Sequence, residues 1–126
     1  MQELCAGTGS TRPWGQFSTP SFIPGVGAFK ILWVSPLQRL SLQKHAHRME
    51  HWVVLTGEVQ AEVGTNTTVL ARGDHVVVPV GVWHRLSNPS EVDTALVAEI
   101  QVGDSPTPAI MEEDIERKED DYGRVD

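Results

Sequence analysis

The chain has 126 residues and a mass of 13.9 kDa, which is enough for one domain with a single core. Its formal net charge of −7, a sequence pI near 5.1 and the absence of any basic run argue against a nucleic-acid-binding surface. The one cysteine, Cys5, cannot form an internal disulfide, and no apolar run reaches the roughly 20 residues of a membrane helix. We therefore expect a cytoplasmic protein with no affinity for nucleic acid or membrane.

Residues 1–10 are small and polar, and their composition predicts a flexible leader before a single domain over residues 11–126. A run rich in proline and glycine follows, with Phe17, Phe22 and Phe29 spaced along it as aromatic anchors. This pattern indicates an extended N-terminal arm. Such an arm either covers an edge of the domain or pairs with a neighbouring subunit, so it is compatible with a homodimer.

The first full strand is expected at Ala28 to Val34, and a second begins near Arg39. Alternation along this second segment places Ser41, Gln43 and His45 on one face and Leu40 and Leu42 on the other. Residues 52–56 are mostly aromatic or β-branched and end directly before Gly57, which predicts another strand. A polar strand face should therefore lead into a short turn, after which the chain brings Glu50 back beside it.

Further strands are predicted at residues 58–63 and, after a turn, at residues 67–70. Three more are predicted, of which one ends at Pro79, one begins at His84 and one lies within residues 92–102. Short strands separated by glycine, asparagine or proline are typical of an antiparallel sandwich or barrel. Residues 109–126 are acidic and are expected to form a short surface helix or a tail.

The segment from Gly73 to Asn88 contains glycine, five residues, Pro79-x-Gly81, two residues, His84, three residues and asparagine. This spacing resembles the second motif of the cupin superfamily without a gap. The resemblance implies an all-β, single-domain cupin fold, which is a double-stranded β-helix or jelly-roll barrel. The extended arm and the acidic C-terminal segment would flank that barrel.

The first cupin motif admits two registers here, because histidines occur at both position 45 and position 47. If His45 and His47 form the His-x-His pair, only two residues separate His47 from Glu50, one fewer than the family pattern. If Gln43 and His45 take those places, every interval fits. The one departure is Leu37, at a position where the family usually has glycine after proline.

Several blocks, in the same order, resemble the type II mannose-6-phosphate isomerases, a module that also forms the carboxy-terminal part of bifunctional mannose-1-phosphate guanylyltransferases. The resemblance covers roughly residues 11 to 124. The blocks are residues 12–15, 40–43 with 45–52, 84–89, 113–117 and 120–124.

This resemblance implies one bound divalent transition metal, which could be Zn, Mn, Fe, Co or Ni. The ligands expected from the better register are Gln43, His45, Glu50 and His84, with His47 as the alternative to Gln43. Two neutral imidazoles, one carboxylate and one amide oxygen are acceptable donors for such ions and leave positions open, as a catalytic site requires.

The activity implied is the interconversion of mannose 6-phosphate and fructose 6-phosphate. A base moves a proton between neighbouring carbons while a cation stabilises the developing oxygen charge. We expect His47 as that base, with Glu50 as the second catalytic group, and a sugar phosphate as the partner. The substrate-binding candidates are the cations at Arg12, Lys30, Arg48, Arg85 and Arg124.

Two other functions are consistent with the sequence. One is a non-catalytic cupin that binds a sugar phosphate or nucleotide sugar, and the other is a different small-molecule cupin enzyme such as a dioxygenase. Among the remaining candidates, His47 could be a loop histidine without a catalytic role. Strand alternation predicts that His51 points away from Glu50 and that His75 lies at the rim. The four tryptophans are expected to belong to the core.

Overall fold

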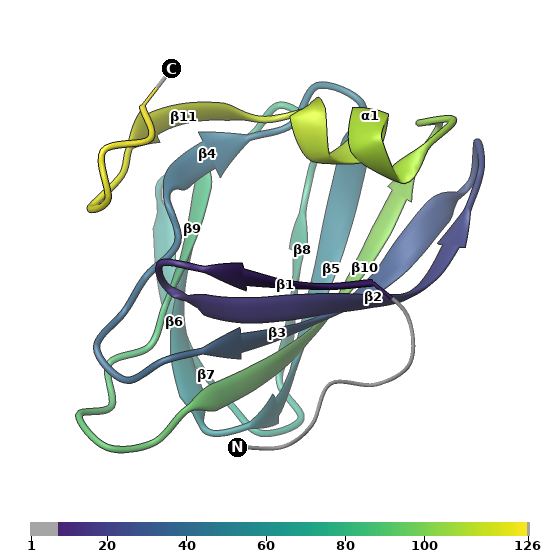
Figure 1. The fold of residues 1–126 in the computed structure, drawn as a ribbon. Helices are drawn as coiled ribbons and strands as arrows, with labels where there is room; N and C mark the ends of the chain where they lie inside the picture. Colours follow the sequence, from purple (N-terminus) through teal and green to yellow (C-terminus); the bar gives the residue numbers. More distant parts are fainter. Residues whose placement is uncertain (1–7, 126) are drawn as a thin grey trace.

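The computed structural model describes residues 8–125, which form two antiparallel sheets facing one another as a barrel (Figure 1). The first sheet has the order β1 (Thr8–Arg12), β2 (Gly15–Ile23), β3 (Gly27–Val34), β10 (Ala95–Gly103), β5 (Arg48–Thr56) and β8 (His75–Val78). The second has the order β11 (Glu116–Glu119), β4 (Leu42–Lys44), β9 (His84–Ser87), β6 (Glu58–Val63) and β7 (Asn66–Ala71).

The predicted all-β architecture is confirmed, and β6 and the start of β9 lie where the sequence places them. The polar stretch behaves differently from the prediction. β5 begins at Arg48 rather than near Trp52, so the turn after β4 covers only residues 45–47. The reason is that the polar side chains of β5 find partners inside the barrel, so the strand can continue through them.

The N-terminal arm is a regular part of the first sheet. β1 and β2 form a hairpin, β2 pairs with β3, and Phe17 is buried against the core. Residues 8–10 belong to β1, whereas the rest of the predicted leader, including Cys5, lies outside the residues that the structure describes. The arm therefore extends the sheet beyond β3.

The inward-facing rows of three adjacent strands change from polar to apolar along the barrel. On β5 the buried residues are Arg48, Glu50, Trp52 and Val54, in alternating positions. β3 and β10 repeat this order, because Lys30 pairs in register with Glu99, and the next inward pair is Leu32 with Val97. One end of the barrel is consequently a packed apolar core, and the other end has a charged interior.

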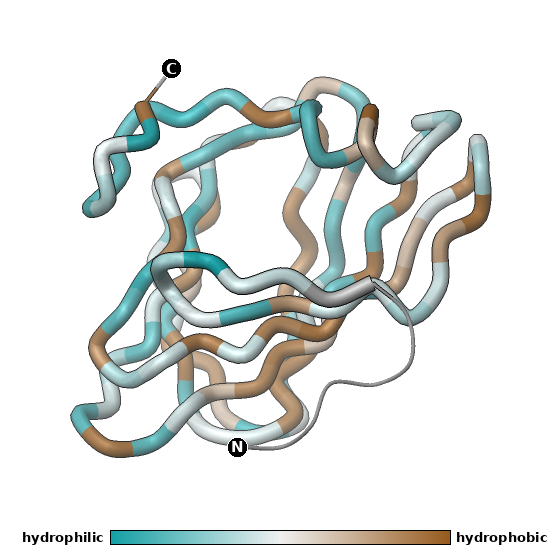
Figure 2. Tube along the Cα trace, in the orientation of Figure 1, coloured by the Kyte–Doolittle hydropathy of each residue, from teal (hydrophilic) through white to brown (hydrophobic). Residues whose placement is uncertain are grey.

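Figure 2 shows this division, with the hydrophobic colour strongest in the strands at the lower end and hydrophilic colour along the upper end. The buried core cluster consists of Trp14, Phe17, Leu32, Val34, Trp52, Val54, Val59, Ala61, Leu70, Val78, Leu86, Ala95 and Val97. Three of the four tryptophans are buried as predicted, while Trp83 is half-buried beneath the Lys44 ammonium, 4.7 Å from the ring centre.

The acidic C-terminal segment crosses the polar end of the barrel (Figure 1). It forms α1 (Pro108–Glu113), whose N-cap Thr107 accepts a hydrogen bond from the Ile110 amide, and then β11, which pairs with β4. Proline suits the first helical position, because a backbone N–H there would have no acceptor within the helix. In residues 8–125 there is no helix with the length and apolar character needed to cross a membrane.

Leu37, the residue found where the family has glycine, adopts a φ of 61° and is exposed. It is the third residue of a turn closed by a hydrogen bond of 3.1 Å from the Gln38 amide to the Ser35 carbonyl, and Pro36 precedes it. Proline followed by a residue with positive φ is the arrangement of a type II turn, which favours glycine at that position. The turn is therefore kept at a steric cost.

We expect Leu37→Gly to stabilise the protein. A left-handed backbone costs an L-residue about 1–2 kcal/mol, part of which glycine loses again through the greater entropy of its unfolded chain. A net gain of about 0.5–1 kcal/mol should raise the melting temperature by roughly 2–5 °C. Thermal denaturation of the two proteins checks this, and an unchanged or lower melting temperature would contradict it.

Candidate metal centre

Three buried side chains converge at the polar end of the barrel. The donor atoms of His45, Glu50 and His84 all lie within 4.8 Å of one another. His45 follows β4, Glu50 is on β5 and His84 opens β9, so both sheets contribute. The pairing of Gln43 with His84 in register brings β4 and β9 together at this point.

Each histidine is oriented by its Nδ1 atom. His45 Nδ1 lies 2.6 Å from the Asp114 carbonyl oxygen, and His84 Nδ1 lies 2.9 Å from the Val82 carbonyl oxygen. Because a carbonyl oxygen only accepts a hydrogen bond, both Nδ1 atoms must be the donors. Each Nε2 atom can then bind a cation, or it can share a proton with Glu50. The Nε2 atoms lie 3.0 Å and 3.7 Å from the two Glu50 oxygens.

The Glu50 carboxylate has further donors. Arg48 Nε and Trp52 Nε1 each donate to it at 3.0 Å. Burial acts to raise the pKa of Glu50, but the hydrogen bond from His45 and the positive charges around the carboxylate lower that pKa well below its usual value. Burial also lowers the pKa of His84, so its imidazole is favoured in the neutral form that metals bind.

These donors fit the metal expected from the sequence. Two neutral imidazoles and one ionised carboxylate form a set that first-row divalent ions accept, and three protein ligands leave positions for substrate. The orienting hydrogen bonds to backbone carbonyls are the kind of outer partners that fix the tautomer of metal-binding histidines. The buried residues could therefore hold a divalent ion and leave part of its coordination open.

The two residues that compete for the fourth ligand position lie in different surroundings. Gln43 is buried, and its amide nitrogen donates to Ser41 Oγ at 3.0 Å, so its carbonyl oxygen remains available as a ligand. His47 is exposed in the turn, where its backbone amide donates to Asp114 Oδ2 at 2.9 Å. The structure thus places Gln43 in the barrel interior, paired in register with His84, and places His47 at the surface.

The remaining histidines form a separate pair on the outer side of the first sheet. His51 Nε2 lies 3.0 Å from His75 Nδ1, and both side chains are at least partly exposed. Their parity on β5 and β8 is opposite to that of Glu50, as the sequence predicts. They serve below as a control site.

A cavity of about 130 Å³ lies inside the barrel beside the metal centre, with Gln43 and Glu50 in its wall. A single water needs about 10–15 Å³ by such a measure, so the cavity admits a small polar ligand. Five cationic side chains line it against three carboxylates, although the chain as a whole is acidic. The cations are Arg12, Lys30, Arg48, Arg117 and Arg124, and the carboxylates are Glu50, Glu99 and Glu112.

Four of the five predicted substrate-binding cations thus line the cavity, whereas Arg85 does not. Arg85 Nε donates to the Leu40 carbonyl oxygen at 3.1 Å, and its guanidinium reaches the Glu119 carbonyl oxygen at 3.2 Å. This side chain therefore fastens β11 to the barrel. The position of Arg85 next to the motif histidine did not show, in the sequence, in which direction its side chain points.

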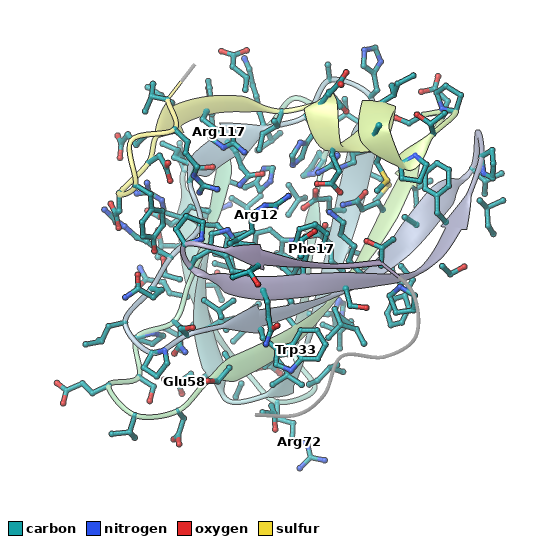
Figure 3. The ribbon with its side chains drawn as sticks, in the orientation of Figure 1. Arg12, Phe17, Trp33, Glu58, Arg72 and Arg117 are labelled. Atoms are coloured by element: carbon teal, nitrogen blue, oxygen red, sulfur yellow. The ribbon has the colours of Figure 1, made fainter. Side chains whose placement is uncertain are left out.

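Two cavity residues, Arg117 and Glu99, were not among the candidates chosen from the sequence. Arg117 is the least exposed residue of β11 and faces the barrel interior with Arg12, as Figure 3 shows. Glu99 lies on the same inward row as Val97. A charged residue at the buried parity of an apolar strand was a signal that could have identified it.

Glu99 is 6% exposed, and one of its oxygens accepts a 2.5 Å hydrogen bond from Gln101 Nε2. Burial raises the pKa of Glu99 to about 7, and the negative charge of Glu50 adds to this effect, while Lys30 and Arg48 oppose it. The carboxyl group therefore changes its charge near neutral pH.

Residues 2–120 match the family model described as mannose-6-phosphate isomerase C-terminal. The chain is 38% identical over 114 residues to the alginate biosynthesis protein AlgA of Pseudomonas aeruginosa, and 33% identical over 116 residues to the mannose-1-phosphate guanylyltransferase ManC of Salmonella typhimurium. Each alignment covers 90% of this chain and 22% of the relative, so the chain spans about a fifth of their length.

Solved structures confirm the cupin fold. The cupin-2 domain Rru_A2000 of Rhodospirillum rubrum superposes with a TM-score of 0.69 at 19% identity, over 90% of this chain and 84% of that one. At this identity the likeness concerns the fold alone.

Metal binding should stabilise the protein through His84. At a concentration of Zn²⁺, Mn²⁺ or Co²⁺ about 100-fold above Kd, the free energy of unfolding should rise by about 2.7 kcal/mol. His84→Gln should weaken binding by more than about 100-fold, since even outer partners of metal ligands contribute about 10–100-fold. Metal content and the metal-induced shift in melting temperature measure both effects.

The matched control is His51→Gln, because His51 lies on the same barrel but faces outward. This variant should bind metal as the unaltered protein does. Equal loss of metal in the two variants would contradict a centre built on His84.

Glu99 should also make stability depend on pH. Its pKa is about 7 in the folded protein and about 4.5 in the unfolded chain, so the folded state holds the extra proton between these values. The contribution of Glu99 to stability should therefore fall as pH rises from about 4.5 to about 7, by on the order of 3 kcal/mol, and level off above that. The low pKa of Glu50 acts below this window. The lowered pKa of His84 acts within it with the opposite sign, because below pH 6.5 the unfolded imidazole takes up a proton that the folded one does not.

Denaturant unfolding of the metal-free protein at pH 5 and pH 8 checks the effect. Glu99→Gln should lose the Glu99 contribution, so its stability at pH 8 relative to pH 5 should exceed that of the unaltered protein. The control Glu58→Gln changes an exposed carboxylate at the other end of the barrel (Figure 3) and should keep the difference of the unaltered protein. Parallel pH dependence in Glu99→Gln and the unaltered protein would refute this account.

Proposed function

The chain belongs to the mannose-6-phosphate isomerase C-terminal family, and on that basis we propose that it is a metal-dependent isomerase that interconverts mannose 6-phosphate and fructose 6-phosphate. The observation that carries the proposal is the shared wall of the metal centre and the cationic cavity. Glu50 belongs to the centre and also lines the cavity. A sugar phosphate bound there would have its reacting carbons beside the metal and its phosphate among the cations.

Aldose–ketose isomerisation needs three things from a site, which are a cation near the carbonyl oxygen, a group that moves a proton and an anchor for the phosphate. A divalent ion held by His45, Glu50 and His84 would supply the electrostatic part as a Lewis acid. The low pKa of Glu50 and the orientation of both imidazoles support ligation at neutral pH. His45, Glu50 and His84 are almost completely buried, and burial strengthens the charge interactions among them.

The cavity cations divide into two groups by their contacts. Arg48 donates to Glu50 and, at 2.6 Å, to the Met111 carbonyl oxygen, while Lys30 forms an ion pair with Glu112. These two cations hold the metal centre and α1. We assign the phosphate to the three cavity cations that come from the two ends of the chain.

These three cations are Arg12, Arg117 and Arg124, which come from the two ends of the chain. The Arg12 guanidinium lies 4.8 Å from the centre of the Phe17 ring, and Arg124 is bound at 2.8 Å by Asp120. Guanidinium groups suit this task because their planar donors pair with two phosphate oxygens at once.

A coupled assay of fructose 6-phosphate formed from mannose 6-phosphate tests the proposal directly. The purified chain should show turnover that is lost on chelation and restored by a divalent transition metal. Arg12→Gln should raise KM about 10–100-fold, since a hydrogen bond to a charged group contributes about 1.5–3 kcal/mol.

The matched control is Arg72→Gln, since Arg72 is exposed at the opposite end of the barrel (Figure 3) and should leave KM unchanged. Binding of mannose 6-phosphate without turnover, at any metal loading, would reject the isomerase and favour the non-catalytic sugar-phosphate-binding cupin.

A further inference from the structure

Glu99 occupies the centre of the charged wall of the cavity. It lies on β10, between β3 and β5, with Lys30 opposite it on β3 and Trp52 opposite it on β5. The side chain is 6% exposed and lines the same cavity as Glu50. It is therefore a buried acidic group within the space where we place the substrate.

The three cavity carboxylates have different partners. Glu50 is held by His45, Arg48 and Trp52 as part of the metal centre. Glu112 forms an ion pair with Lys30 at the side of α1, where its side chain is 37% exposed. Glu99 instead accepts a hydrogen bond from the neutral amide of Gln101. Of the three, it is the carboxyl group that a proton can join without displacing a metal ligand or breaking an ion pair.

We propose that Glu99 is the catalytic acid–base group, which carries the proton between C2 and C1 of the sugar phosphate bound in this cavity. This inference rests on the isomerase function proposed above. It replaces the expectation that His47 is the base. The His47 side chain is exposed and lines a surface groove together with residues 113–116, and it does not line the cavity that contains Glu99.

The step balances without another reactant. The Glu99 carboxylate removes the proton from C2 of the aldose, and the electron pair of that C–H bond forms the C1=C2 double bond while the carbonyl electrons move to O1. The O2 hydroxyl proton passes to O1 as C2 becomes the ketone carbon. The Glu99 carboxyl then returns its proton to C1, which yields the ketose and restores the carboxylate.

The surroundings of Glu99 suit both directions of this transfer. A group that takes up and returns a proton works best when its pKa is near the ambient pH, and burial raises the pKa of Glu99 to about 7. Gln101 donates to one carboxyl oxygen at 2.5 Å and so fixes the plane of the group. Lys30, directly across on β3, prevents the burial from shifting the pKa further upward.

The experiment compares the metal-loaded protein with Glu99→Gln, Glu99→Asp and the control Glu58→Gln. Glutamine keeps the size of the side chain and can still accept from Gln101. For Glu99→Gln we expect kcat to fall by about 10²–10⁴-fold, with KM within about threefold and metal content unchanged. Glu99→Asp, which keeps the carboxyl group, should retain an intermediate kcat, and Glu58→Gln should behave as the unaltered protein does.

A second readout is hydrogen exchange with solvent during turnover in D₂O. The unaltered protein should place deuterium at C1 of the fructose 6-phosphate that it forms, and Glu99→Gln should lose this incorporation together with turnover. Deuterium incorporation by the unaltered protein shows that a proton is transferred, and the decrease of kcat and of incorporation in Glu99→Asp assigns the transfer to Glu99 if Glu99→Gln does not fold.

A kcat of Glu99→Gln within about threefold of the unaltered protein would overturn the inference and leave the isomerase function intact. Complete retention of the C2 hydrogen, as in a direct hydride shift, would overturn it in the same way. A lack of turnover in the unaltered, metal-loaded protein would instead overturn the proposed function, and this inference with it.

Discussion

The buried carboxylate of Glu50 is the group on which the rest of the site depends. Removing an ion of this size from water costs several kcal/mol, and only donors in good geometry offset that cost. Arg48 and Trp52 donate to it from its own strand, His45 Nε2 lies 3.0 Å from it on the side of the other sheet, and His84 Nε2 lies 3.7 Å away. Because Arg48 and both imidazoles are themselves held by backbone carbonyl oxygens, the carboxylate ties together β4, β5, β9 and the C-terminal segment.

The same requirement explains why the barrel has two unlike ends. Inward positions of β3, β5 and β10 are apolar toward one end, where they pack as an ordinary core, and charged toward the other, where no apolar neighbour could satisfy them. The acidic C-terminal segment covers the charged end. Asp114 shows how: its carbonyl oxygen orients His45, and its carboxylate accepts the amides of Ala46 and His47. The segment is therefore part of the centre.

Much of this arrangement could be predicted from the sequence, for identifiable reasons. Alternation placed Ser41, Gln43 and His45 on one face of the segment that contains β4, and all three are buried. Motif spacing selected His84 and Glu50. The start of β5 was predicted too late, because a polar run such as residues 48–51 has the composition of a turn, and only its partners across the barrel allow it to form a strand. Arg85 was chosen for its place beside His84, yet its direction depends on β11, which lies distant in sequence.

The sequence by itself determined the class of fold, the strand periodicity and the types of donor atom, because these follow from side-chain alternation and from motif intervals that are local in the chain. Tertiary structure alone decided which charges share a cavity. Glu99 faces Lys30 only through the pairing of β10 with β3, and Arg12 and Arg117 line one cavity although β1 and β11 belong to different sheets. The pKa of Glu99 follows from burial and from the charges of Glu50, Lys30 and Arg48, which are properties of the folded arrangement rather than of any segment.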